Sequence, residues 1–155
     1  METMEKLAEV LNDLIMINND RIAGYEKAAR QADKVDVDLR GIFNTMADDS
    51  RRFVAELSAE VRNLGEEPTD DTTNSGKVYR AWMDVKNAFT NRDRPAILES
   101  CEYGEDAAQK AYEDALASDT EMTAGIRQMI TDQKAHLNKA HKMIKEYRDA
   151  HKAVS

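Results

Sequence analysis

The chain has few cysteine, proline, glycine and aromatic residues, and each shortage excludes a class of structure. Its 155 residues include one cysteine, Cys101, so neither an internal disulfide nor a paired-cysteine site can form. Two prolines and six glycines leave long stretches of good helix-forming residues uninterrupted. No apolar run approaches the roughly 20 residues that span a bilayer. These shortages favour an all-α protein that neither crosses a membrane nor depends on disulfides.

Positive charge is also scarce. The formal net charge is −8, with no cluster of Lys and Arg, and this argues against binding to nucleic acids or to anionic membrane surfaces. The first residues, METMEKLAEV, lack the basic and apolar regions of a secretory signal, so we expect a cytoplasmic protein. Neither a glycine-rich phosphate loop nor a GxSxG motif is present, and no small-molecule substrate is indicated.

Apolar residues recur every three or four positions in four long stretches, a period that predicts amphipathic helices. The predicted helices cover about residues 3–32, 38–64, 94–117 and 120–151, with a short additional helix at 77–91. Gly65 is expected to end the second long helix, and Thr120 to cap the last one.

The connections between these helices predict the topology. Short turns join the first long helix to the second and the third to the fourth, so each pair should form an antiparallel hairpin. The link between the hairpins is long enough to return the chain to the other end of the bundle. We therefore predict one domain over residues 1–155, a ferritin-like four-helix bundle with two hairpins joined by a long crossover.

The motif Gln133-Lys134-Ala135-His136 has the spacing of the Glu-x-x-His ligand pair of di-iron bundles, with glutamine in the first place. The two hairpins can be aligned, because Asn18 and Tyr25 have the same spacing as Glu105 and Tyr112. The alignment of their second helices pairs Ser50 with Gln133 and Phe53 with His136. One half of a di-metal site is therefore replaced by Asn18, Ser50 and Phe53.

Polar residues on the apolar helix faces are expected to form one layer at mid-height of the core: Asn18, Ser50, Glu105, Gln133 and His136. Because buried polar groups need hydrogen-bond partners, we expect these side chains to bond to one another. No residue is assigned a catalytic role, and we favour a protein without enzymatic activity and without a cofactor.

Two alternatives remain open. In the first, a single transition-metal ion is held by Glu105 and His136, with help from Gln133 or Glu102. In the second, the chain is an oxidase with a degenerate di-iron site. Such a site needs several carboxylates to balance the metal charge, and the predicted layer contains one carboxylate, that of Glu105.

The first helix is apolar on all sides around Leu14-Ile15-Met16-Ile17. Val10 and Ile17 then need a cover, either from the crossover helix with Trp82 or from another subunit. Because another subunit can supply this cover, we expect the chain to form a homo-oligomer.

Several stretches together resemble a known bacterial family: LNDLI near the start, Gly24-Tyr25, FVAEL at 53–57 with LG at 64–65, Tyr79-x-x-Trp82, ILESCEYGEDAA at 97–108, and Gln133-x-x-His136 with His141. This family of ferritin-like four-helix bundles is classed as a domain of unknown function. The resemblance implies a cytoplasmic bundle with no established activity and a suggested stress-related role. The activities of iron-storage ferritins and rubrerythrins are not carried over, because they require acidic residues at Asn18, Ser50 and Phe53.

Overall fold

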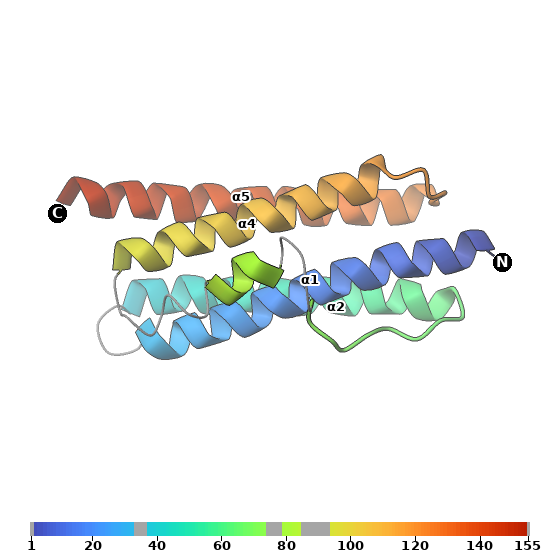
Figure 1. The fold of residues 1–155 in the computed structure, drawn as a ribbon, viewed down its shortest axis with the longest axis horizontal. Coiled ribbons are helices and arrows are strands. Elements are labelled where there is room, and N and C mark those ends of the chain that lie inside the picture. The colour runs from blue at the N-terminus through green and yellow to red at the C-terminus, as the bar shows by residue number, and fades with distance from the viewer. Residues whose placement is uncertain (1, 33–36, 74–78, 85–93, 155) are drawn as a thin grey trace.

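The computed structural model describes residues 2–32, 37–73, 79–84 and 94–154. Within these residues every regular element is a helix, which confirms the prediction of an all-α bundle (Figure 1). The long helices are α1 (Glu2–Ala32), α2 (Val37–Asn63), α4 (Arg94–Ala117) and α5 (Ala124–Val154). A short crossover helix occupies residues 79–84, and the rest of the predicted helix at 77–91 lies outside the described residues. None of the described helices has the length and apolar composition needed to cross a membrane.

The long helices form two antiparallel hairpins. α1 packs mainly on α2 and α4 mainly on α5, while smaller contacts of α1 with α4 and of α2 with α5 join the hairpins. Figure 1 shows that α2 and α4 run in the same direction, so the chain between them returns along the bundle. The long link predicted from the sequence is used for this return.

The end of α2 depends on Gly65. Its backbone has a φ of 82°, a left-handed conformation that is energetically unfavourable for residues with a Cβ. The Gly65 N–H donates to the Arg62 carbonyl at 2.9 Å, and the Glu66 N–H donates to the Val61 carbonyl at 3.2 Å. These two bonds form a Schellman motif and confirm that Gly65 terminates the helix.

The start of α5 differs from the sequence prediction. The helix begins at Ala124, and Thr123, not Thr120, is its cap. The Thr123 hydroxyl accepts the Ile126 N–H at 3.2 Å, the bond that an N-cap side chain makes. Two threonines three residues apart are equally suited by type, so the sequence pattern could not choose between them.

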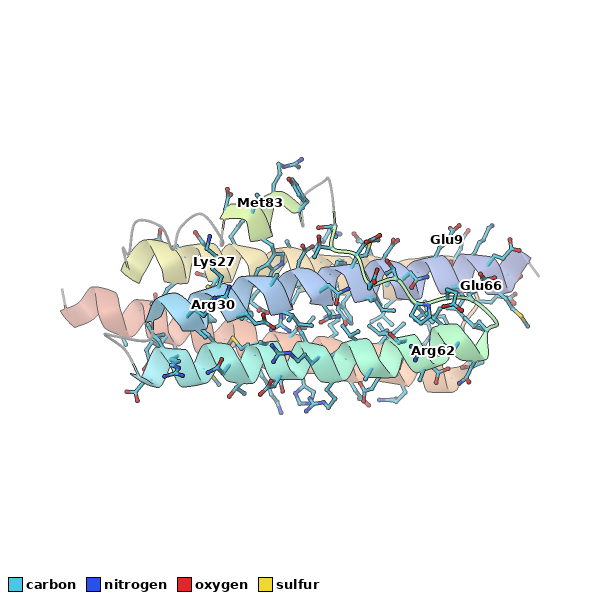
Figure 2. The ribbon with its side chains drawn as sticks, turned by 90° about the horizontal axis from the view of Figure 1, so that it is seen from below. Glu9, Lys27, Arg30, Arg62, Glu66 and Met83 are labelled. Carbon is cyan, nitrogen blue, oxygen red and sulfur yellow. The ribbon has the colours of Figure 1, made fainter. Side chains whose placement is uncertain are left out.

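Residues 66–73, here called the strap, run beside α1 toward the crossover helix. In Figure 2 Glu66 marks the beginning of the strap and Met83 marks the crossover helix. The side chains of Asn12, Asn19 and Asp20 on α1 bind backbone groups of the strap at 2.9–3.3 Å. The strap residues bound in this way are Glu67, Thr69, Asp71 and Thr73.

Ile17 is only 5% exposed within a single chain. The apolar face of α1 therefore needs no second copy to cover it at this residue. Self-association stays a prediction, without the support that we expected from Ile17.

Trp82 anchors the crossover helix to the bundle. Its indole is fully buried and meets the Tyr25 ring of α1 edge-on, with ring centroids 5.3 Å apart. On α4 it lies against Gly104, where an added Cβ would approach the indole carbons to 3.0 Å. The absence of a side chain at Gly104 thus allows the tryptophan to pack directly on the helix.

The buried apolar residues form two clusters. One cluster contains Leu7–Ile17 of α1 with the second half of α2, and the other contains Tyr25–Ala29 with the first half of α2 and Trp82. On α1, α2 and α4 a buried polar residue lies between the two clusters: Asn18, Ser50 and Glu105. On α5 the buried Gln133 lies between Ile130 and Leu137 of the first cluster. The core is therefore interrupted by a polar layer.

We predict opposite effects for two glycine-to-alanine substitutions. Gly65→Ala should lower the free energy of unfolding by about 1 kcal/mol, because alanine is strained at a positive φ. Gly41→Ala lies inside α2 with nothing within 4 Å of the new Cβ, and should raise it by about 0.5–1 kcal/mol. Urea unfolding of both variants measures the difference, and shifts of the same sign would contradict the assigned end of α2.

Candidate functional site: a buried polar layer

An ion pair lies at the centre of the layer. Arg21 of α1 binds Glu105 of α4, with Nε and Nη2 at 2.9 and 2.8 Å from the same oxygen, Oε1. The two side chains are 1% and 0% exposed. The Tyr25 hydroxyl donates a third hydrogen bond to this oxygen. Glu105 is therefore a buried carboxylate whose charge is balanced by a cation from the chain itself.

Hydrogen bonds extend from this pair across α2 and back to α1. Arg21 Nη1 donates to the Ser50 hydroxyl at 2.6 Å, and that hydroxyl donates to Asn18 Oδ1 at 3.0 Å. Asn18 Nδ2 donates to the Tyr112 hydroxyl at 2.8 Å and to the Leu14 carbonyl at 2.8 Å. The uncharged side chains of Ser50 and Asn18 thus extend the hydrogen-bond network from the ion pair toward α5.

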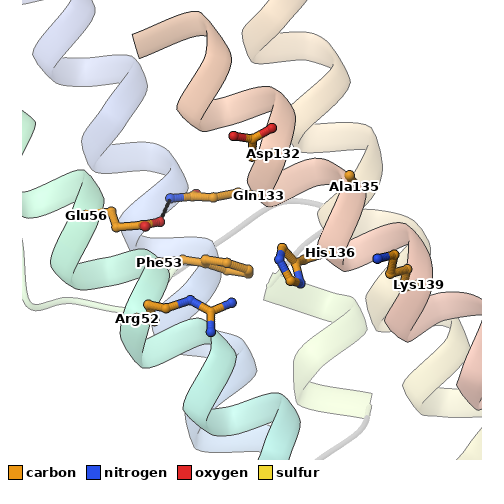
Figure 3. A pocket seen from close by; sticks show the side chains of 8 residues that line it. All are labelled: Arg52, Phe53, Glu56, Asp132, Gln133, Ala135, His136 and Lys139. Atoms are coloured by element: carbon orange, nitrogen blue, oxygen red, sulfur yellow. Dashed lines mark hydrogen bonds between the residues drawn. The ribbon is translucent and has the colours of Figure 1, made fainter. Parts of the chain in front are cut away.

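The network ends at the surface between α2 and α5. The Tyr112 hydroxyl donates to Gln133 Oε1 at 2.6 Å, and Gln133 Nε2 donates to Glu56 Oε1 at 3.0 Å. Figure 3 shows this last bond crossing from α5 to α2. One connected set of hydrogen bonds therefore joins all four long helices.

Burial keeps the two tyrosines of the layer and the neighbouring thiol of Cys101 protonated. Burial raises the pKa of Tyr25 well above its usual value, and the charge of Glu105 raises it further. Burial likewise raises the pKa of Tyr112, and it raises the pKa of the Cys101 thiol. For Arg21 burial lowers the pKa, but the charge of Glu105, the hydrogen bond to it and the two neighbouring tyrosines together outweigh burial, and the net shift is upward. Cys101 is thus a buried thiol and not an activated nucleophile.

The structure places His136 outside the buried layer. Its side chain is exposed and its ring faces Phe53, with centroids 5.8 Å apart (Figure 3). The buried stripe of α5 passes through Ile130, Gln133, Leu137 and Ala140. Around the helix His136 lies about 100° from Leu137 and about 60° from Gln133, so it sits at the edge of that stripe. The expectation that His136 joins the layer is corrected in this way.

The residues considered as metal ligands do not come together. Glu105 and Gln133 lie in the layer, whereas Glu102 lies in a separate contact of α4 with α5. There, His141 Nε2 is 3.9 Å from Glu102 Oε1 and 2.5 Å from Asp106 Oδ1. In the part of the chain that the structure describes, no group of three or more His, Cys, Asp or Glu side chains is placed to hold a metal ion.

Sequence reasoning missed Arg21, the residue that organises the layer. Charged residues are rarely buried, so an arginine inside a helix is read first as a surface residue. The signal was present in the spacing, because Asn18, Arg21 and Tyr25 step by three and four along one face of α1. An arginine on an apolar face indicates a buried acidic partner, and Glu105 was the buried acid already identified.

Fold and layer together define the class of protein: a helical bundle with a buried, ion-paired polar layer. Residues 6–119 match the model of a family described as a domain of unknown function, DUF2383, and the chain belongs to this family. The matched residues include both Arg21 and Glu105 and end before α5. No curated protein matches the chain.

We predict that Arg21→Met lowers the free energy of unfolding by about 3–5 kcal/mol, because it leaves the Glu105 carboxylate buried without a cation. Arg51→Met is the matched control. Arg51 is 46% exposed and pairs with Glu26 and Asp48 at the surface, so its loss should cost at most about 1 kcal/mol. Denaturant unfolding compares the two variants, and equal small losses would show that the buried pair does not support the fold.

We also predict a loss of stability in alkali. In the folded protein Tyr25 and Tyr112 stay protonated above 10.0, the ordinary tyrosine pKa, whereas the unfolded chain releases these protons. The unfolded state then binds fewer protons, so the free energy of unfolding falls as pH rises beyond about 10. Absorbance of tyrosinate near 295 nm should show a late step that coincides with unfolding. Tyr25→Phe and Tyr112→Phe should each reduce this step, and two variants with an unchanged late step would refute the assignment.

Proposed function

We propose that this protein is a non-catalytic, ferritin-like bundle that acts through its surface, with an arginine–glutamate pair in place of a di-metal centre. The ferritin-like assignment is supported by the order of the helices. Two antiparallel hairpins are joined by a long return, and α1 packs beside α4 while α2 packs beside α5.

The observation that carries the proposal is the place of Arg21. A metal site in such a bundle uses inward-facing carboxylates to balance the charge of the ions. Here the inward-facing carboxylate of Glu105 is bound by the Arg21 guanidinium at 2.8 and 2.9 Å. A divalent cation at Glu105 would meet this fixed positive charge at close range, in a buried setting where screening is weak.

Both metal alternatives have less support. One ion shared by Glu105 and His136 needs these residues to converge, and the His136 side chain is exposed beside Phe53. A degenerate di-iron oxidase needs further acidic ligands, but Asn18, Ser50 and Gln133 are neutral and are engaged with one another through Tyr112.

The resemblance noted from the sequence supports a bacterial, cytoplasmic and stress-associated protein, and these attributes are part of the proposal. The net charge of −8 supports a partner other than nucleic acid. The function is then performed by contacts of the outer helix faces with other macromolecules.

Metal analysis tests the proposal. Protein purified without chelator should contain far less than one transition-metal ion per chain, and its melting temperature should not change with added Zn²⁺, Mn²⁺ or Fe²⁺. A bound ion present at 100 times its Kd would add about 2.7 kcal/mol of stability, which a melting curve detects. Stoichiometric metal that is lost in both Glu105→Gln and His136→Ala would overturn the proposal in favour of the single-ion site.

A further inference from the structure

We propose that the groove between α2 and α5 binds a basic amphipathic helix of a protein partner. This inference rests on the proposed function, in which the bundle acts through its surface. α2 and α5 make the sparsest mutual packing of the neighbouring helices, and two pockets of roughly 420 and 580 Å³ lie between them. Because His136 and Lys139 line both pockets, the pockets form one continuous groove.

The floor of the larger pocket is apolar. Ile42 and Met46 of α2 face Ala140 and Met143 of α5 in the larger pocket, and Phe53 lies in the smaller one. Met143 is 45% exposed although it is a large apolar side chain. Exposed apolar side chains along a groove between two helices fit the apolar face of a third helix.

The rim of the groove carries more negative than positive charge. Asp38, Asp49, Glu56 and Asp132 are its acidic residues, against Arg52 and Lys139. Arg52 is already engaged, because it lies 3.6 Å from Asp49 and over the Phe53 ring.

Glu56 and Asp132 flank Gln133 from opposite helices, as Figure 3 shows. Among the described residues no Lys, Arg or His forms an ion pair with either of these two carboxylates. They are therefore available to a lysine or arginine on the edge of a docked helix.

The same charges argue against a second copy of this chain as the occupant. Two chains of net charge −8 repel each other, and each groove presents excess carboxylate to the other. A partner helix with an apolar face and basic flanks is complementary both to the apolar residues and to the acidic rim of the groove.

Two fluorescent helical peptides test the inference. Both have the same leucine face, and their flanks carry lysine in one and glutamate in the other. Fluorescence anisotropy should show saturable one-to-one binding of the lysine peptide that weakens as salt is added. Binding of the glutamate peptide should be at least about tenfold weaker, because its flanks meet the acidic rim.

Two variants locate the binding. Gly41→Phe fills the groove, since nothing lies within 4 Å of its Cβ, and Glu56→Gln with Asp132→Asn removes two rim charges. Each variant should lower the affinity for the lysine peptide by about fivefold or more. The control, Glu5→Gln with Glu9→Gln, makes the same change of net charge at exposed positions of α1 outside the groove, and should leave the affinity unchanged. The helical circular dichroism spectrum verifies that each variant is folded. If Gly41→Phe does not fold, the double rim variant alone tests the inference.

Three results would overturn the inference. The first is equal binding of both peptides, and the second is an equal loss of affinity in the control variant. The third is a dimer in sedimentation that Gly41→Phe dissociates, because a second copy would then occupy the groove. These results are independent of metal content, so failure of the groove and failure of the proposed function are distinguishable.

Discussion

The rest of the core is arranged around one buried ion pair, Arg21 with Glu105. Removing two charges from water costs several kcal/mol per ion, so such a pair persists only where hydrogen bonds satisfy it. Tyr25 and Ser50 supply two of those bonds, and the Ser50 hydroxyl in turn donates to Asn18. A single arginine thus requires compatible residues on other helices, and this requirement defines the register of the bundle at mid-height.

The apolar parts of the molecule are arranged on either side of this layer. The cluster around Leu11 and Leu57 and the cluster around Tyr25 and Phe43 each bury aliphatic and aromatic side chains, and the hydroxyls of Tyr25 and Tyr112 reach from these clusters into the layer. Trp82 closes the second cluster on the α1–α4 side, where it packs on Gly104 and on the Tyr25 ring. The crossover therefore packs against Tyr25, the residue whose hydroxyl donates to Glu105.

The helices and much of the polar layer could be predicted from the sequence, whereas its central residue could not. Periodicity located the long helices because apolar side chains must share a face, and it placed Asn18, Ser50, Glu105 and Gln133 on those faces. It failed for His136, because a three-residue step is compatible with two adjacent stripes and only packing selects between them. It failed for Arg21, because the sequence does not reveal which charge finds a buried partner. Thr123 as the cap of α5 was missed for a similar reason, since two equivalent threonines compete.

The central claim is that Arg21 and Glu105 stabilise the fold as a pair. A double-mutant cycle of Arg21→Met and Glu105→Leu, followed by denaturant unfolding, measures their coupling directly. Removing both charges should destabilise the protein less than the sum of the single changes, by about 2 kcal/mol or more, because neither charge is then left unpaired. Strictly additive losses would contradict this claim, because they would show that the two residues contribute independently.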